Sequence, residues 1–415
     1  MEVLYFLTRN FTFIVYALLI ISFVIGIKVA PGKQLHAEKG FSLEAMTSLK
    51  GIMALFVLCH HISQKKLFQQ THTIPIFEFI GFLFVGIFFF CSGYGLYKSF
   101  STKENYLANF PRKRILPIAI SYFVMIAIYA VYYLIVGNNF THTQWILKLS
   151  GLILINSQSW YVYVIILMYF AFYLIYKNEK LRKDGVFLLL VVALVQGALF
   201  IFNGHFPWWL GAKDWWKNGG LWSAPWWKTP LALLFEGEWW VNSTVAFAFG
   251  VFIAEKEKSF IDWIKNSYWT KLFLITLIFA GVTYAGIVAN WNIGYWSDVG
   301  GDLGFWKKTV MYLIQCIQII TTCLWIIVVM QKCYVSNGFY RFYGKCSLEV
   351  YLIQEMILFS WAYLIEKGMG PQTTPIIGYA NWNAAVYAIL VFLTVSVSAI
   401  VYHWINTLAT KPLKK

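Results

Sequence analysis

Two ionisable residues, Lys50 and His61, lie eleven positions apart within an apolar stretch of the chain. An α-helix turns about 100° per residue, so His61 returns to within about 20° of the face that carries Lys50, about 16 Å further along the axis. His60 falls about 80° to the other side of this line. Ionisable groups in such a stretch usually face a cavity or a partner. His61 could therefore act as a general base at neutral pH; the alternative is a hydrogen-bonded structural histidine with a lysine that reaches the interface.

Two further groups could hold or activate a ligand. Arg112 and Arg114 flank Lys113 just before a long apolar run. Guanidinium groups bind phosphates bidentately, although three adjacent cations at the start of a span also act as a topology signal. Glu355 lies near the middle of another apolar run, where an unpaired carboxylate is costly. It could orient the His61 imidazole or carry a proton.

The elements that must position these residues are membrane-spanning helices. Of the 415 residues, 60% are hydrophobic and 12% are charged, with a mean hydropathy of +0.63. A soluble domain is about half apolar and about one quarter charged, whereas runs of about 20 apolar residues cross a bilayer as helices. The sequence predicts an all-α, polytopic bundle of about eleven spans, near 11–30, 48–64, 79–97, 115–136, 158–176, 185–202, 240–254, 271–289, 309–331, 346–366 and 385–404. The run 146–155 is too short to cross and is expected to be re-entrant or interfacial.

The basic residues predict the orientation of these spans. If the loops after odd-numbered spans face the cytoplasm, that side holds 23 of the 33 Lys and Arg residues. The positive-inside rule then places the amino terminus outside and the carboxyl terminus in the cytoplasm. The net charge of +15 is accounted for in this way and requires no nucleic acid. The first apolar run has Arg9 ahead of it and no small-residue cleavage pattern, so we expect a retained helix.

Several other kinds of site lack support in the sequence. No CxxC pair or Cys/His cluster indicates a metal site, and cysteines within apolar runs behave as small hydrophobic residues. Neither the GxSxG of serine hydrolases nor the Gly-Lys-[Ser/Thr] ending of a P-loop is present. The stretch 203–240, expected outside, contains nine Trp residues. They would anchor this segment at headgroup depth, form a stacking platform for a sugar, or do both.

Four short patterns follow one another along the chain. They are Lys50 and His61 with ten residues between them; Phe88 to Tyr94, read as FFFCSGY; Arg112 and Arg114; and Gly344, Ser347, Tyr351 and Leu352 at the start of the tenth span. Taken alone, the small residues of FFFCSGY would serve close helix packing. Together and in this order, the patterns resemble the acyltransferase-3 family of membrane O-acyltransferases over residues 41–404. The chain has Lys50 where the family usually has Arg, and Gln354 where many members have His.

The resemblance implies an organisation and an activity. Residues 1–40 would form an additional amino-terminal helix and cytoplasmic loop, 41–404 the ten-helix acyltransferase domain, and 405–415 a basic cytoplasmic tail. The family transfers an acyl group, commonly acetyl from cytoplasmic acetyl-CoA, to a hydroxyl of a cell-envelope glycan or lipid-linked sugar at the plasma membrane.

For this activity our hypothesis is that His61 acts as general base and that Glu355 orients its imidazole or carries a proton. Covalent passage of the acyl group through His61 is the less favoured variant. The donor would be held by Lys50, Arg112 and Arg114. No metal is expected.

Two other classes of protein would use similar residues. A proton-coupled transporter or flippase for a glycan or lipid precursor would use intramembrane His and Glu residues as a proton relay. Such transporters often contain repeated halves with broken helices, and the sequence shows no such symmetry. A non-catalytic assembly partner could bind heme, but the adjacent His60 and His61 point in different directions along a helix. The acyltransferase interpretation is therefore favoured.

Overall fold

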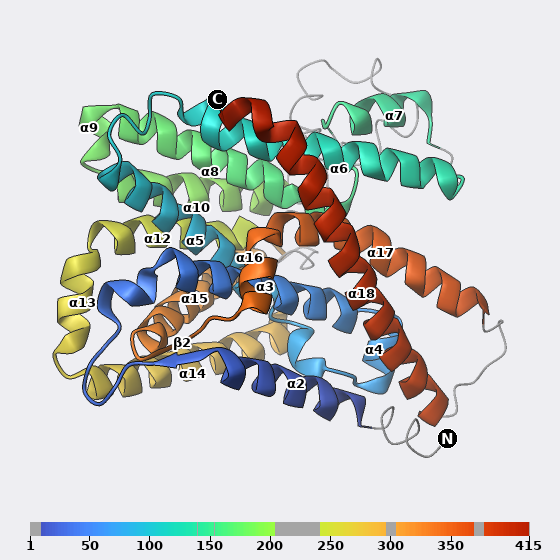
Figure 1. Ribbon diagram of the computed structural model, residues 1–415, viewed down its shortest axis with the longest axis horizontal. Helices are drawn as coiled ribbons and strands as arrows, with labels where there is room; N and C mark the ends of the chain where they lie inside the picture. The colour runs from blue at the N-terminus through green and yellow to red at the C-terminus, as the bar shows by residue number, and fades with distance from the viewer. Residues whose placement is uncertain are drawn as a thin grey trace. The chain divides into compact units, whose positions relative to one another are not determined.

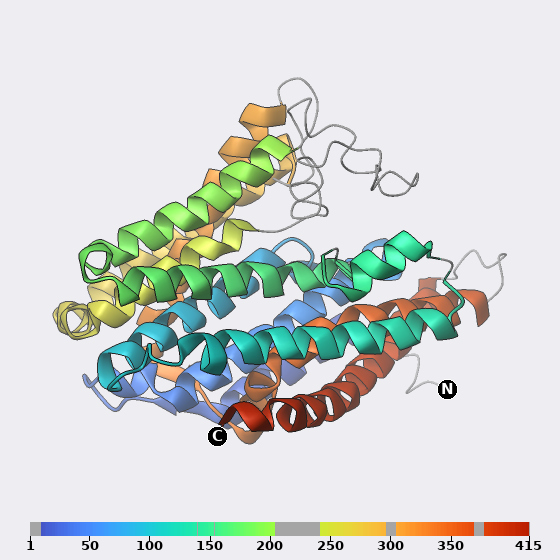
Figure 2. The ribbon, with the colours of Figure 1, turned by 90° about the horizontal axis from the view of Figure 1, so that it is seen from above.

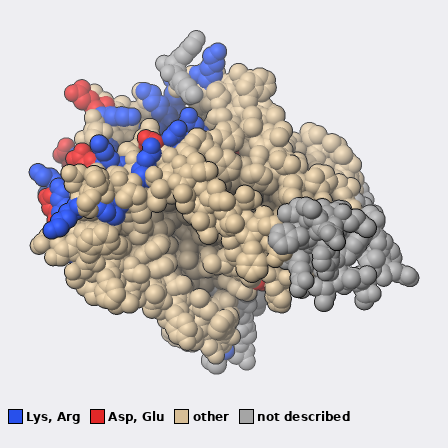
Figure 3. Space-filling model, turned by 60° about the horizontal axis from the view of Figure 1, so that its bottom comes forward, with Lys and Arg blue, Asp and Glu red and all other residues tan. Residues whose placement is uncertain are grey.

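The computed structural model describes residues 10–138, 140–152, 154–203, 241–295, 304–368 and 377–414. Each of the eleven predicted spans coincides with a helix in these ranges, which confirms the all-α prediction. Within them, seven helices are long and apolar enough to cross a membrane, and three shorter apolar helices begin at Phe11, Gly185 and Val241. The remaining helix, α17 (Ser347–Gly368), coincides with the tenth predicted span and carries the carboxylates of Glu349 and Glu355. Figure 3 shows Lys and Arg gathered in one part of the face in view, with a broad uncharged surface over the rest.

The described contacts divide the chain into two compact units, and the first contains residues 1–88 and 326–405. Its elements are α2 (Phe11–Gly26), α3 (Leu43–Ser63), α4 (Lys66–Thr71), the start of α5 (Gly81–Thr102), α16 (Gly338–Lys345), α17 and most of α18 (Ile377–Thr410). In this unit α3 packs against both α16 and α17 (Figure 1). The candidate residues on α3 therefore lie inside the unit, with helices on more than one side.

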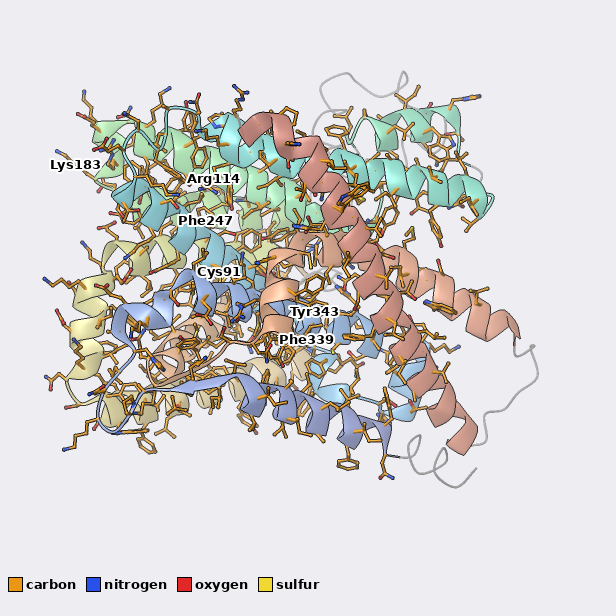
Figure 4. All side chains as sticks on the ribbon, viewed as in Figure 1. Cys91, Arg114, Lys183, Phe247, Phe339 and Tyr343 are labelled. Carbon is orange, nitrogen blue, oxygen red and sulfur yellow. The ribbon has the colours of Figure 1, made fainter. Side chains whose placement is uncertain are left out.

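Two glycines allow the backbones of α3 and α16 to touch. A Cβ atom at Gly51 would lie 1.9 Å from the carbonyl oxygen of Tyr340, and one at Gly344 would lie 1.8 Å from that of Thr47. Any larger residue would force the helices apart, so the family-like Gly344 has a packing role. The ring of Tyr343 on α16, labelled in Figure 4, also stacks on the ring of Phe392 on α18.

A short antiparallel sheet ties the segment after α2 to the segment before α16. Its strands are β1 (Ile27–Val29) and β2 (Cys333–Val335), with Lys28 opposite Tyr334. The ammonium group of Lys332 donates hydrogen bonds to the carbonyl oxygens of Ala30, Gly32 and Gln34, at 2.8, 2.6 and 3.1 Å. These contacts close one end of the first unit.

The second unit contains residues 89–325 and 406–415. Its elements are the rest of α5, α6 (Leu116–Ile135), α7 (His142–Leu149), α8 (Trp160–Lys177), α9 (Glu179–Arg182), α10 (Gly185–Asn203), α12 (Val245–Glu255), α13 (Glu257–Lys265), α14 (Tyr268–Ile293) and most of α15 (Gly304–Met330). Within it, α8 lies between α6 and α10 (Figures 1 and 2).

Small residues of the FFFCSGY pattern bring α5 against α12. A Cβ atom at Gly93 would lie 2.1 Å from the carbonyl oxygen of Phe247, and one at Gly250 would lie 2.2 Å from that of Phe90. Below this contact the buried carboxylate of Glu257 accepts hydrogen bonds from the Tyr94 hydroxyl and the Lys98 ammonium group, both at 2.7 Å. In the structure, the small residues of FFFCSGY therefore serve close helix packing, as the sequence predicts.

Three further segments had a predicted role: 146–155, 405–415 and 203–240. The short run 146–155 contributes only the end of α7, an eight-residue helix. The expected tail, 405–415, continues α18 as far as Thr410 and then forms a 3-10 turn over Lys411–Lys414. The Trp-rich stretch of 203–240, including its predicted role as an anchor or stacking platform, lies outside the described residues apart from Asn203.

Candidate active site

Helix α3 positions both Lys50 and His61. It begins after Ser42, whose hydroxyl oxygen accepts a hydrogen bond from the Ala45 amide at 3.3 Å and so caps the first turn. The helix is unbroken from Leu43 to Ser63, so the two side chains share one face, about 16 Å apart along the axis. Both are half-buried, whereas neighbouring Leu58 is almost fully buried. The face that carries them therefore has accessible space beside it.

His60 is held by the protein backbone. Its Nδ1 atom lies 2.7 Å from the carbonyl oxygen of Phe77, and because a carbonyl can only accept, Nδ1 donates and carries a proton. The imidazole also covers Gly81 so closely that a Cβ atom there would lie 2.2 Å from the ring. Both contacts fix the orientation of the ring and give His60 a structural part in joining α3 to the segment before α5.

His61 has different surroundings, although its ring centre lies only 5.0 Å from that of His60. Its imidazole has a side chain, that of Gln64, as hydrogen-bond partner, and the nearby ammonium group of Lys65 repels it when it is protonated. Side chains reorient more readily than a backbone carbonyl, so the Gln64 contact fixes His61 less firmly than the Phe77 carbonyl fixes His60. The structure thus distinguishes two adjacent histidines that have similar partial exposure.

Glu355 lies on the face of α17 that points toward the end of α3. The ammonium group of Lys65 lies 4.2 Å from the ring centre of Phe359, which is one helical turn beyond Glu355. Lys65 is in turn four residues beyond His61. His61 and Glu355 therefore each lie four residues before a member of this contact between the segment after α3 and α17. The Glu355 side chain is half-buried, with Oε2 fully buried.

Gln354, the neighbour of Glu355, is fully buried. Within the described ranges neither its amide nitrogen nor its amide oxygen has a hydrogen-bond partner. An unsatisfied buried polar atom costs about 1–3 kcal/mol, so a water molecule or a ligand is the expected partner. In the sequence, Gln354 is notable only because many members of the family have His at this position. Its burial without a hydrogen-bond partner in the described residues adds it to the candidate site residues.

Another histidine of the first unit, His403, is paired with a carboxylate. His403 lies in α18, within the candidate membrane span Ala384–Leu413. Its Nδ1 atom is 2.9 Å from Oε1 of Glu349, a carboxylate only 7% exposed. Sequence reasoning missed this pair because its members are far apart in the chain; a His and a Glu in two neighbouring predicted spans were the available signal.

Arg112 and Arg114 belong to the second unit and lie on a π-helical turn, Pro111–Ile115. Such turns are rare and often occur at functional sites. The two side chains diverge: Arg112 is exposed and donates to the Pro412 carbonyl oxygen at 3.5 Å. Arg114, labelled in Figure 4, is half-buried and its guanidinium carbon lies 5.3 Å from the centre of the Tyr106 ring. The structure therefore does not bring the two guanidinium groups together as one clamp.

A family model described as an acyltransferase domain matches residues 43–403. The chain belongs to the acyltransferase-3 family. No curated protein and no solved structure matches it. The matched range of this membrane acyltransferase begins at Leu43, the first residue of α3, and ends at His403. It includes Lys50, His61 and Glu355, while α2 precedes it.

Proposed function

We propose that this acyltransferase moves an acetyl group from cytoplasmic acetyl-CoA to a hydroxyl of a cell-surface or lipid-linked polysaccharide in the plasma membrane. The observation that carries the proposal is the face of α3 on which half-buried Lys50 and His61 lie about 16 Å apart. An extended donor along this face would have its phosphates near the ammonium group of Lys50 and its thioester near the imidazole of His61.

In this mechanism His61 is the general base. Its neutral nitrogen accepts the proton of the acceptor hydroxyl as the oxygen attacks the thioester carbonyl carbon. The tetrahedral intermediate then expels the sulfur, which takes the proton from the imidazolium, so that the acetyl ester and free CoA are the products. Glu355, on the neighbouring helix α17, stabilises the imidazolium. His60 holds α3 in place through its hydrogen bond to Phe77.

The roles of the basic residues follow from the proposed orientation. The positive-inside rule assigns Arg112, Arg114 and the end of the predicted span that carries Lys50 to the cytoplasmic side, where acetyl-CoA is present. A glycan acceptor would reach His61 from the opposite side of the membrane. No metal has a role in this scheme, because the histidine supplies the base and the thioester is already activated.

The proposal is tested by measuring acetyl transfer or acetyl-CoA hydrolysis with radiolabelled donor and purified protein in nanodiscs. We expect turnover by the wild type, and for Lys50→Gln an increase in KM for acetyl-CoA of about tenfold, because one charge-assisted hydrogen bond to the donor is lost. Lys50→Arg, which keeps the charge, should stay close to the wild type. If the wild type neither binds nor turns over short acyl-CoA, the proposal fails, and proton-coupled transport of a glycan or lipid precursor becomes the function to test.

A further inference from the structure

A hollow of about 430 Å³ lies in the second unit, between the end of α5 and the end of α8. Its wall includes Phe100, Lys103, Asn105, Tyr106, Tyr173 and Lys177. Small-molecule sites have volumes of about 300–1,000 Å³, so the hollow is large enough for a nucleotide. It lies on the side of the protein that the basic loops assign to the cytoplasm.

A cationic side chain lies over each aromatic ring of this wall. Arg114 lies over the Tyr106 ring at 5.3 Å, Arg182 over the Phe100 ring at 5.2 Å, and Lys177 over the Tyr173 ring at 5.1 Å. None of the residues that line the hollow is acidic. The hollow therefore combines flat aromatic surfaces with positive charge, as sites for phosphorylated aromatic ligands do.

The wall is held in place by packing. Phe110, fully buried at the end of the loop after α5, stacks on Tyr173 with the ring planes 11° apart and on Phe172 with centroids 5.9 Å apart. The loop turns at Asn105, whose φ of 49° is a left-handed conformation that Asn adopts more readily than most residues. A site that is already formed loses less entropy when a ligand binds.

The charges of the wall suit an anion. Lys103 and Lys177 are exposed and line the hollow, and the ammonium group of Lys177 donates a hydrogen bond to the Tyr173 hydroxyl at 3.0 Å, which it would exchange for a bound phosphate. Burial raises the pKa of the Tyr106 phenol, and the neighbouring guanidinium of Arg114 offsets part of that rise. An adjoining hollow shares Lys177 and contains both Lys180 and Glu179, so its charges partly cancel. The positive potential is therefore strongest in the first hollow.

We propose that this hollow binds the 3′-phosphorylated adenosine end of acyl-CoA, with the adenine against Tyr106 and the 3′-phosphate on Lys103 and Lys177. The inference rests on the proposed function, because it assumes an acyl-CoA donor. It adds a nucleotide subsite that the predicted donor contacts, Lys50, Arg112 and Arg114, did not include. Of these predicted contacts, only Arg114 adjoins the subsite, because its guanidinium group lies over the Tyr106 ring.

The first test measures binding of adenosine 3′,5′-bisphosphate and adenosine 5′-monophosphate to purified protein in phosphatidylcholine nanodiscs. We expect the bisphosphate to bind more tightly, and Lys103→Gln and Lys177→Gln each to weaken its binding about tenfold, through loss of one charge-assisted hydrogen bond. Lys258→Gln is the matched control, because Lys258 is an exposed lysine on α13 that does not line the hollow. It should bind like the wild type. Unchanged binding of the bisphosphate in both hollow variants would overturn the proposal.

The second test compares KM for acetyl-CoA with KM for its analogue lacking the 3′-phosphate. The wild type should distinguish the two donors, and Lys103→Gln and Lys177→Gln should distinguish them less. Normal turnover with unchanged discrimination would overturn the subsite and leave the proposed function standing. Conversely, bisphosphate binding that depends on both lysines, without turnover of any acyl-CoA, would support the subsite and contradict the proposed function.

A lipid phosphate is the competing source of the same chemistry. Repeating the binding measurement in nanodiscs that contain phosphatidylglycerol separates the two. The proposal predicts that the bisphosphate still binds, with the same dependence on Lys103 and Lys177. If phosphatidylglycerol abolishes nucleotide binding and the two variants lose lipid binding instead, the hollow is a headgroup site and the proposal is wrong.

Discussion

At the scale of single residues, the two adjacent histidines of α3 have different partners. The sequence predicts that one of them aligns with Lys50, but it contains no local signal that the other binds a carbonyl oxygen. His60 donates to Phe77 and lies against Gly81, contacts made through chain segments that fold back on α3. Gln354 is a similar case, because its lack of a partner depends on tertiary packing.

Substitution of Gly81 by Ala tests the structural role of His60. The added Cβ would lie 2.2 Å from the His60 ring, so the imidazole must move and its hydrogen bond to Phe77 is lost. We expect a loss of about 1–3 kcal/mol in stability, seen as a lower Tm in detergent. Gly95→Ala on the same helix is the control, since a Cβ there meets nothing within 4 Å. Equal Tm values for the two variants would argue against a close contact.

At the scale of elements, the helices that coincide with the eleven predicted spans could be predicted because apolar runs mark them in the sequence. Three smaller features could not. The strands β1 and β2 pair residues far apart in the chain, α16 is a short helix without a long apolar run, and the π-helical turn at Pro111–Ile115 differs from an α-helix only in its hydrogen bonds. Each depends on contacts or backbone geometry that residue types do not specify.

The contact between α3 and α16 gives a prediction at this scale. In Gly51→Ala the new Cβ would meet the Tyr340 carbonyl oxygen at 1.9 Å, and backbone cannot move aside as a side chain can. We expect destabilisation of about 1–3 kcal/mol or more and lower acyltransferase activity, because α3 carries Lys50 and His61. Gly338→Ala at the start of α16 meets nothing within 4 Å and should keep both its Tm and its activity. The contact would be refuted by a Gly51→Ala protein as stable as the control.

At the scale of the whole molecule, the distribution of basic residues predicts which loops face the cytoplasm. The prediction matters for the mechanism, because acetyl-CoA must reach the protein from that side. It can be checked with single cysteines placed at Asn138, in an expected outer loop, and at Lys258, in an expected inner one. Both positions are exposed.

A membrane-impermeant maleimide applied to intact cells should label Asn138→Cys directly and Lys258→Cys only after permeabilisation. None of the six cysteines, all in the described part of the chain, forms a disulfide, and half-buried Cys59 and Cys333 should be replaced first to remove background labelling. The reverse pattern would place the amino terminus inside and would contradict the proposed direction of acetyl transfer.

The central claim is that His61, rather than His60, acts as the base. Acetyl transfer from acetyl-CoA should be compared for the wild type, His61→Ala and His60→Ala in nanodiscs, with Tm and size-exclusion profiles as checks on folding. Loss of a general base lowers kcat by about 10²–10⁴-fold, so we predict such a loss in folded His61→Ala. His60→Ala should have a lower Tm but nearly normal kcat per folded molecule. Full activity in His61→Ala, or loss confined to a well-folded His60→Ala protein, would contradict the account.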